Sequence, residues 1–563
     1  MLRRAVSLPQ RHPRTFAFVL YLCASLLVFG VPIAGDPARR CACLFASTDP
    51  GAYDWAFVWW PHALLHGLNP FVSHDIFAPG GVNIAHSALI PGPALVLAPL
   101  TAAFGPIFSY NVMIVLAPVL AAWFAFLLCR RLSKSVGAAL VGGWLFGYSS
   151  YLLGQLTAHP NLALVFLAPA MVHLTLRRVD GEISQRRFVA LLALVLAGQF
   201  LISTEMLFTM SMFGAVALAL ACLTAGPAAR GRVLATLPRI GLSYLIAGVV
   251  LAPYLYYALQ PGGNTVDVAR SQLFSNDLLN FAFPTEITRV GRKQFFFLGK
   301  VYRAGFVESS AYLGLPLLAI AAAQAITRWR RAGTRILVGV LLVAALLSMG
   351  GRLHVAGVRT LPLPWAAFDG FPVAGLALPV RFVVAAALAA AVLCALWLAD
   401  PVRRSAVRWA VALIAVVALL PNVSGHYWQS RQPIPAFFES GNYKRYLRHD
   451  EIVLILPLGI SDNSMLWQAR TRNWFRLAGG YIGEPVAPEY KRDPVFPGLL
   501  TGAPIARPEA AYSSFLRRHR VDHIVVDPNL PGPWPPLFAR LGMHEQRVGG
   551  VLLYRVPPPP SSP

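Results

Sequence analysis

The chain has 563 residues, of which 56% are hydrophobic and 13% are charged. Soluble domains carry about 25% charged residues, so this composition cannot cover the surface of a soluble protein of this length. Disorder, collagen and coiled coil are excluded as well, which leaves an α-helical polytopic membrane protein. The 48 basic and 24 acidic residues give a net charge of +24. The positive-inside rule accounts for this excess better than a nucleic-acid partner does, so no nucleic acid is expected.

About eleven transmembrane helices are expected, because a span needs about 20 mostly apolar residues. The candidates are residues 15–34, 107–129, 136–154, 160–176, 188–203, 206–224, 240–259, 309–326, 336–350, 380–399 and 406–421. A further apolar stretch, 88–104, is interrupted by three prolines at 91, 93 and 99. It is expected to be re-entrant or interfacial rather than spanning.

Basic residues set the expected orientation. Four arginines precede the first span, so the N-terminus is placed in the cytoplasm. The inner connections are then all short and basic: Arg130, Arg131 and Lys134; Arg177, Arg178, Arg186 and Arg187; Arg230, Arg232 and Arg239; Arg328, Arg330, Arg331 and Arg335; Arg403, Arg404 and Arg408. Counting 88–104 as a span would put these clusters outside. The excess of Arg over Lys indicates a GC-rich bacterial genome. A bacterial protein with this many spans is expected to be a multi-pass protein of the inner membrane.

The larger non-spanning pieces are expected outside the cytoplasm. They are the loops 35–106, 260–308 and 351–379 of a membrane domain that covers residues 1–421. Residues 422–556 are expected to form a small extracytoplasmic α/β domain. Its expected strands are 451–458, 521–527 and 548–556, its expected helices are 508–520 and 536–542, and a disordered tail, 557–563, follows.

The first outer loop concentrates the scarce carboxylates of the chain. Asp49 and Asp54 lie in this loop, and the stretch 52–66 has helical spacing of Trp55, Trp59 and His62. This pattern predicts an amphipathic helix that anchors Trp side chains at the headgroup level. Helix capping is the alternative role of both aspartates. Cys41 and Cys43, in the same loop, could be oxidised or bind a metal, but no neighbouring partner favours either.

Three segments resemble a known superfamily. They are 48-TDPGAYDWAFVWWPHALLHGLNPF-71 with FAPGGVNIA after it, 154-GQLTAHPNLALVFL-167 and 379-PVRF-382. An acidic residue after the first span followed by an interfacial helix is similar to the GT-C membrane glycosyltransferases, in particular an uncharacterised bacterial group. The resemblance implies a polyprenyl-linked sugar donor, a glycan or lipid acceptor and contact with membrane lipids. No D-x-D or W-W-D-Y-G motif occurs, which disfavours a metal, and no cofactor is expected.

Sugar transfer from a lipid phosphate to a hydroxyl needs a base that takes the acceptor proton. Asp49 is the first candidate for this base and Asp54 the second. The phosphate is already a good leaving group, so it needs positive charge rather than a general acid. A single displacement would invert the anomeric centre.

Residues for binding the donor or its phosphate must face outside. The candidates are Arg270, Arg292, Lys293 and Arg303 in the second long loop, Arg381 at the outer end of a span, Glu205 and His159 at outer turns, and His86 in the first loop. An Arg or Glu at the end of an apolar span is costly without a partner, which indicates function. The plain alternatives are a solvated face for the loop residues and a turn cap for Glu205 and His159.

Two other functions remain open at this point. A transporter or flippase of a lipid-linked sugar would need polar residues at mid-membrane, and the spans have almost none. A non-catalytic envelope assembly protein would not need the loop carboxylates. The sugar, the acceptor and the linkage cannot be read from these residues.

Overall fold

The computed structural model describes residues 11–44, 49–262, 268–292, 295–371, 374–401, 405–439, 441–459, 463–483, 490, 492–530 and 532–557. The chain divides into two compact units. The first unit comprises Met1–Ala34, Val112–Leu251 and Thr265–Trp428, and the second comprises Gly35–Asn111, Ala252–Asn264 and Gln429–Pro563. Each unit is described separately.

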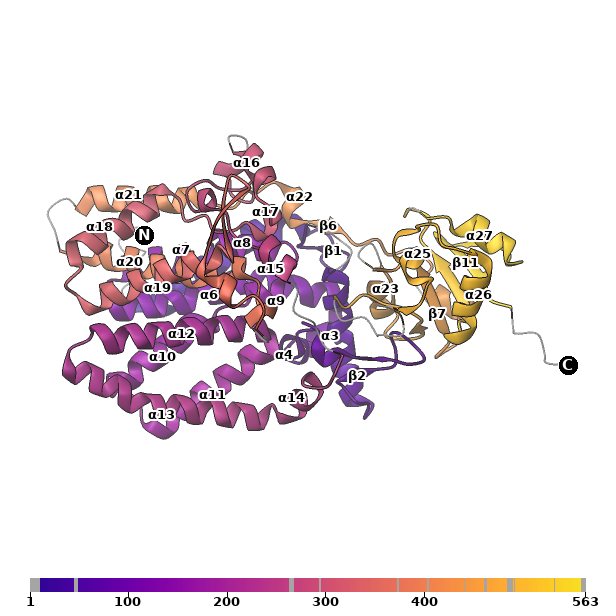
Figure 1. Ribbon diagram of the computed structural model, residues 1–563, viewed down its shortest axis with the longest axis horizontal. Helices are drawn as coiled ribbons and strands as arrows, with labels where there is room; N and C mark the ends of the chain where they lie inside the picture. Colours follow the sequence, from indigo (N-terminus) through magenta and orange to yellow (C-terminus); the bar gives the residue numbers. More distant parts are fainter. Residues whose placement is uncertain are drawn as a thin grey trace. The chain divides into compact units, whose positions relative to one another are not determined.

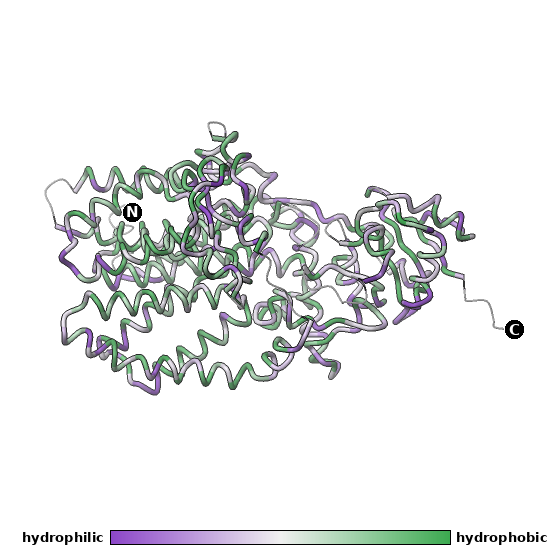
Figure 2. Tube along the Cα trace, in the orientation of Figure 1, coloured by the Kyte–Doolittle hydropathy of each residue, from purple (hydrophilic) through white to green (hydrophobic). Residues whose placement is uncertain are grey.

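The first unit is a bundle of long helices that lie side by side with nearly parallel axes (Figure 1). They are apolar along their lengths and hydrophilic mainly at their ends (Figure 2). The helices are α2 (Pro13–Ser25), α6 (Pro106–Ser133), α7 (Val136–Gly147), α8 (Ser150–Leu156), α9 (Pro160–Ala163), α10 (Leu167–Val179), α11 (Gln185–Ile202), α12 (Thr204–Thr224), α13 (Pro227–Val250), α18 (Leu315–Arg328), α19 (Ala332–Ser348), α20 (Val383–Ala399) and α21 (Ser405–Ala418).

Seven helices in the described part of the chain are long and apolar enough to cross a membrane. The helices α7 and α8 form an eighth candidate, bent by 43° at the break between them. The helices α18, α19 and α21 are apolar but shorter. All eleven expected segments therefore contain helix, while length and composition alone support seven or eight spans.

One boundary differs clearly from the expectation. The span expected at 240–259 is α13, which begins at Pro227 and ends at Val250. Its basic residues, expected in a connection, lie inside the helix at Arg230, Arg232 and Arg239. Gly226 followed by proline at the first helical position starts the helix early, and arginine is a good helix former whose long stem covers apolar surface.

The core of the first unit is built on small side chains. The helix α20 is rich in alanine, and it packs against α7 and α19. A Cβ atom at Gly142 would lie 2.6 Å from Cys129 Sγ, and one at Gly147 would lie 2.4 Å from Ala122 Cβ. Helices in membranes associate through such close backbone approach, because burial of apolar surface supplies no drive there.

A two-stranded hairpin, β4 (Arg352–Val355) and β5 (Val358–Pro362), stands outside the helices of the first unit. Its turn residues Ala356 and Gly357 have φ values of 50° and 78°. The buried carboxylate of Asp277 accepts hydrogen bonds from both backbone N–H groups, at 3.1 and 2.7 Å. Two positive φ values make the mirror-image turn that suits a hairpin, and Asp277 fixes it there.

The second unit contains a five-stranded sheet and the helices of the segment Gly35–Asn111. The sheet order is β10 (Gln546–Val548), β11 (Val551–Arg555), β9 (His523–Val526), β7 (Ile452–Leu456) and β8 (Arg476–Leu477). The strand β7 runs parallel to β8 and β9, and β11 runs antiparallel to β9 and β10. The expected helices near 508–520 and 536–542 are present as α26 (Pro508–Arg518) and α27 (Trp534–Arg540).

The helix α3 (Asp49–Leu65) packs within the second unit against α23 (Ser464–Arg470). Its Trp55 and Trp59 rings stack with centroids 5.3 Å apart and are at most 1% exposed. Trp55 donates a hydrogen bond to Gln468 at 2.7 Å. The expectation that these indoles anchor α3 at the headgroup level is therefore wrong, because they form the core of this unit.

Two other features of the first outer segment are resolved. Residues 88–104 form two short helices, α4 (Pro91–Val96) and α5 (Ala98–Phe104), broken at Leu97. This break agrees with a segment that does not span, since proline interrupts the helical hydrogen bonds. Cys41 and Cys43 form a disulfide bond, the outcome for which the sequence offered little support.

Candidate functional site

A buried ionic cluster lies in the first unit around Arg381, in the short 3₁₀ turn Pro379–Phe382 that leads into α20. Its guanidinium donates to Glu205 through Nη1 and to Glu308 Oε1 through Nη2, the latter at 2.7 Å. The side chains of Arg381 and Glu308 are only 12% and 6% exposed. Low exposure removes water as a competing partner and makes these bonds strong.

Helix ends place the members of this cluster. Ser203 caps α12 and puts Glu205 in its first turn. Glu308 is the last residue of α17 (Gly305–Glu308), and His159 precedes Pro160, the first residue of α9. Gln155 of α8 donates to Glu308 Oε2 at 2.8 Å, while His159 Nδ1 lies 3.8 Å from Glu308 Oε1.

The charges of the cluster decide what it can bind. Burial alone raises the pKa of Glu308, but the Arg381 guanidinium outweighs it and lowers that pKa to about 2. Two carboxylates therefore form ion pairs with one guanidinium, so the positive charge of Arg381 is compensated within the cluster. Arg381 would have to bind the donor phosphate next to these two carboxylates, which disfavour a further anion, so donor binding by Arg381 and Glu205 stays a prediction.

The second unit holds the two candidate bases, both on α3. Asp49 lies in the first turn, half-buried, and accepts a hydrogen bond from the Tyr481 hydroxyl at 3.2 Å. The positive end of the helix dipole favours a charged carboxylate at this position. Asp49 is thus a partly accessible carboxylate in the first turn of a helix.

Asp54 has the opposite environment. Its side chain is fully buried, and neither oxygen has a hydrogen-bond partner in the described part of the chain. Burial raises the pKa of Asp54 well above its ordinary value. The nearby hydroxyl of Tyr110 is also buried without a hydrogen bond. Asp54 is therefore harder to ionise than an exposed carboxyl group and is buried away from an acceptor, which makes it a weaker candidate for the base.

The other candidates are spread over both units. His86 Nε2 lies 3.1 Å from the carbonyl oxygen of Gln260, which ties two segments of the second unit together. Arg270, Arg292 and Arg303 are exposed in the part of the first unit between residues 268 and 308. Lys293 lies outside the described residues. These exposed arginines remain candidates for binding the donor phosphate.

The structure thus brings together three of the expected residues, Arg381, Glu205 and His159, within the first unit. It places Asp49 and Asp54 on one helix of the second unit. Sequence reasoning missed Glu308 and Tyr481. The scarcity of acidic residues was the only signal for Glu308, which stands in the ordinary-looking segment 305-GFVESS-310. Among the described residues, no group of three or more His, Cys, Asp or Glu side chains could hold a metal ion.

Solved structures share this fold. The arabinofuranosyltransferase AftD from Mycobacteria superposes with a TM-score of 0.58 at 16% identity, over 96% of this chain and 40% of AftD. The Archaeoglobus fulgidus oligosaccharyltransferase, tethered with an acceptor peptide, gives 0.54 at 10% identity, over 92% of this chain and 70% of that one. AglB from the same organism, in complex with an inhibitory peptide and a dolichol-phosphate, gives 0.50 at 12% identity over the same shares.

The fold is therefore that of the GT-C superfamily of membrane glycosyltransferases. This chain spans 40% of the length of AftD. Within the superfamily fold, the chain belongs to the family described as "Domain of unknown function (DUF6311)", whose model matches residues 18–420. No curated protein matches the sequence.

Proposed function

We propose that this protein is a membrane glycosyltransferase that moves a sugar from a polyprenyl-phosphate donor to an acceptor hydroxyl. The observation that carries the proposal is Asp49, a half-buried carboxylate in the first turn of α3 on a GT-C fold. The complex of AglB with a dolichol-phosphate supports the donor class. We place the reaction at the outer face of the membrane, because the basic connections predict that residues 35–106 lie on that side.

Asp49 is the general base in this proposal. Its carboxylate accepts the proton of the acceptor hydroxyl while the oxygen attacks the anomeric carbon of the donor. The bond from the anomeric carbon to the phosphate oxygen breaks, and the lipid phosphate leaves with the electron pair. One displacement inverts the anomeric centre. The Tyr481 hydroxyl, 3.2 Å from Asp49 Oδ1, orients the carboxylate.

Positive charge for the leaving phosphate comes from the outer loop of the first unit rather than from Arg381. Arg270 and Arg292 are exposed there, and Arg303 follows on the same loop. The Arg381–Glu205–Glu308 cluster instead fixes the outer ends of α12, α17 and α20 with respect to one another. His159 lies at the edge of this cluster and is 22% exposed. In this proposal, its imidazole ring contacts the sugar donor.

The experiment is sugar transfer in membranes that contain the protein, with a panel of tritiated polyprenyl-phosphate sugars as donors. We expect Asp49→Asn to lower transfer by roughly 10²–10⁴-fold, the range of general base catalysis. Tyr481→Phe should lower it less, because the carboxylate remains. Asp36→Asn removes a half-exposed carboxylate from the same segment and should leave transfer unchanged.

An equal loss in the Asp36 and Asp49 variants would refute the assignment of Asp49, because it would show a general effect of charge. Loss in Asp54→Asn alone would transfer the role of base to Asp54. No transfer by the wild-type protein from any donor of the panel, while donors cross proteoliposomes unchanged, would favour a flippase and contradict the proposal.

A further inference from the structure

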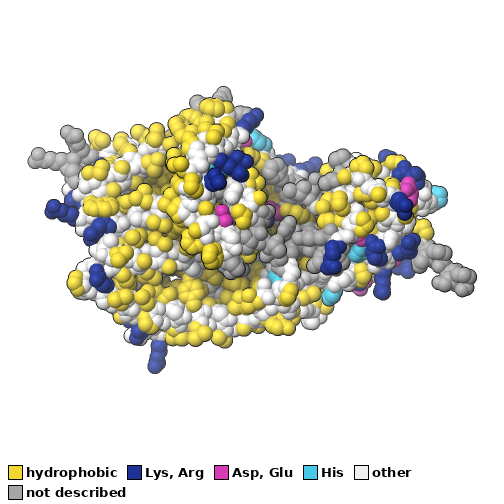
Figure 3. Space-filling view, viewed as in Figure 1, with side chains coloured by type: hydrophobic (Ala, Val, Ile, Leu, Met, Phe, Trp, Pro, Cys, Tyr) yellow, Lys and Arg dark blue, Asp and Glu magenta, His cyan; other side chains and the backbone are white. Residues whose placement is uncertain are grey.

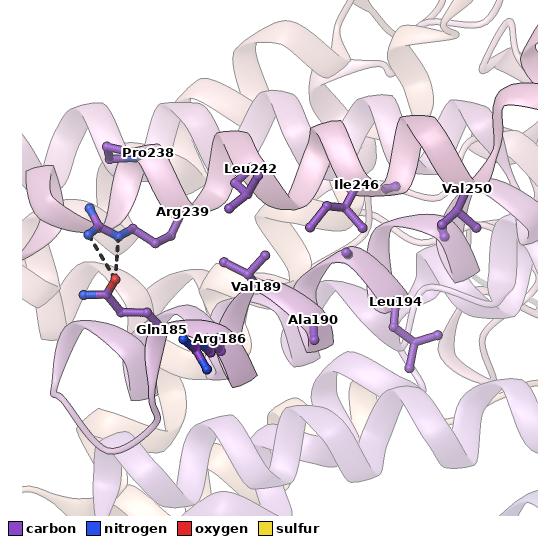
Figure 4. A pocket seen from close by; sticks show the side chains of 13 residues that line it. Gln185, Arg186, Val189, Ala190, Leu194, Pro238, Arg239, Leu242, Ile246 and Val250 are labelled. Carbon is purple, nitrogen blue, oxygen red and sulfur yellow. Dashed lines mark hydrogen bonds between the residues drawn. The ribbon is translucent and has the colours of Figure 1, made fainter.

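An apolar groove runs along the seam between α11 and α13 in the first unit (Figure 4). Its volume is about 810 Å³, and side chains of these two helices alone line it. Leu242, Ile246 and Val250 of α13 form one wall, opposite Val189 and Leu194 of α11. Nothing in the proposed mechanism uses this groove.

Small side chains create the groove. On α11, Ala190, Ala193 and Ala197 recur at the spacing of one helix face and leave room where larger side chains would fill the seam. Pro238, inside α13, lacks a backbone N–H and lines the groove beside Arg239. From Arg186 to Ala197 the groove follows α11 for about 16 Å, at 1.5 Å per residue.

One end of the groove is polar and positively charged. Arg239 donates from Nε and Nη2 to Gln185 Oε1, at 3.2 and 3.0 Å, and from Nη1 to the carbonyl oxygen of Ala235. Arg186 lines the same end and is exposed. Among the described residues, no carboxylate forms an ion pair with Arg186 or Arg239, so their charges are not neutralised by the protein.

We propose that this groove binds one anionic phospholipid, with an acyl chain along the apolar seam and the phosphate on Arg186 and Arg239. The charge at one end and the apolar length together match a lipid, since a soluble phosphate would contact only the charged end and leave the apolar seam unoccupied. Basic pockets between transmembrane helices bind anionic head groups in this manner. The bound lipid fills the space between α11 and α13.

The ligand is a bilayer phospholipid rather than the sugar donor. Arg186 lies at the start of α11, whereas Glu205 of the ionic cluster follows the other end of this helix at Ile202. The helix rises by about 24 Å from Arg186 to Ile202, at 1.5 Å per residue, which approaches the thickness of the hydrocarbon core. The head group thus lies at the opposite ends of the helices from the cluster. The inference is independent of the proposed reaction.

The test is native mass spectrometry of the full-length protein in detergent, titrated with phosphatidylglycerol. Two variants change the groove in different ways. Arg186→Gln with Arg239→Gln removes the positive charges, and Ala190→Phe fills the apolar seam. We expect each to weaken binding of one phosphatidylglycerol by about tenfold or more. Phosphatidylcholine, which has no net charge, should bind the wild-type protein more weakly.

Matched controls carry the same chemical changes elsewhere. Arg187→Gln with Arg230→Gln removes two exposed arginines that do not line the groove, and Ala215→Phe enlarges an exposed alanine of α12. Both should bind phosphatidylglycerol within about twofold of wild type. Unchanged binding by either groove variant, or an equal loss in the controls, would overturn the proposal. Tighter, equally groove-dependent binding of undecaprenyl phosphate would overturn it as well, by making the groove a site for the carrier lipid.

Discussion

At the scale of single residues, two aspartates of one helix have opposite environments. Asp49 is half-buried at the positive end of α3, while Asp54 is fully buried and has no hydrogen-bond partner among the described residues. Pairs of carboxylates that differ in this way commonly divide acid and base roles at neutral pH. The sequence pointed to both residues because carboxylates are scarce, but only burial distinguishes them.

The raised pKa of Asp54 predicts a pH dependence of stability. The folded state keeps the proton of Asp54 to higher pH than the unfolded chain does, so stability falls as pH rises above the unfolded pKa of about 4. Asp54→Asn removes this ionisation. We therefore expect its melting temperature, relative to wild type, to be higher at pH 8 than at pH 5. An identical difference at both pH values would contradict the raised pKa of Asp54.

The lowered pKa of Glu308 predicts a pH dependence of stability of the opposite sign. Its pKa is lowered in the folded state to about 2, so its stabilisation is present above the unfolded value of 4.5 and is lost as pH falls toward 2. Glu308→Gln should destabilise the protein at pH 7 by about 3–5 kcal/mol, because it leaves buried Arg381 with one partner. Thermal unfolding measures this. Glu182→Gln, at an exposed ion pair, should destabilise the protein far less, because solvent screens that pair.

The residues of the ionic cluster show why sequence alone was insufficient. Arg381 lies 176 residues from Glu205 and 73 from Glu308 in the chain. An arginine at the start of an apolar span predicts a partner for its charge. The local sequence does not indicate that two carboxylates form ion pairs with it. The role of Arg381 as a phosphate ligand stays a prediction, whereas its two carboxylate partners became evident only from the structure.

At the scale of elements, apolar stretches predicted helices well and their ends poorly. The prolines of 88–104 predicted the break in that segment. In contrast, α13 begins well before its expected start at residue 240, because arginines can continue a helix. The strands β7, β9 and β11 were found from their apolar runs. The burial of α3 was not predicted. A helix with tryptophan on one face has the same sequence pattern in a protein core and at the membrane interface.

The β4–β5 hairpin gives a prediction at this scale. Ala356 has φ +50°, a conformation that costs a residue with a Cβ atom about 1 kcal/mol relative to glycine. Ala356→Gly should therefore raise the free energy of unfolding by roughly 0.5–1 kcal/mol. As a control, Ala345→Gly within α19 should lower it by a similar amount. Destabilisation by Ala356→Gly would contradict the assigned turn.

At the scale of the whole molecule, the charge excess of the sequence predicts how the chain crosses the membrane. On the face seen in Figure 3, hydrophobic side chains cover the region of the helices, and many Lys and Arg side chains lie at its edges. Basic residues at helix ends fit the positive-inside rule. The seven or eight helices long enough to span do not by themselves fix the orientation.

Cysteine labelling tests this orientation. The unpaired cysteines at 23, 129, 222 and 394 are first replaced by alanine, with the Cys41–Cys43 disulfide kept. In intact spheroplasts, a membrane-impermeant maleimide should label Arg303→Cys, on the outer loop. It should label Arg187→Cys only after the membrane is permeabilised. The reverse pattern would place the outer loops in the cytoplasm and contradict the proposed location of the reaction.

The central claim is that Asp49 is the base of a sugar transfer, and single-turnover transfer in proteoliposomes tests it most directly. Wild type, Asp49→Asn and Asp49→Glu are each loaded with a polyprenyl-phosphate sugar that the wild-type protein uses, and the transferred tritium is followed in time. We predict that Asp49→Asn slows the step by at least about 10²-fold while Asp49→Glu retains part of the rate. A rate for Asp49→Asn equal to that of wild type would contradict the account.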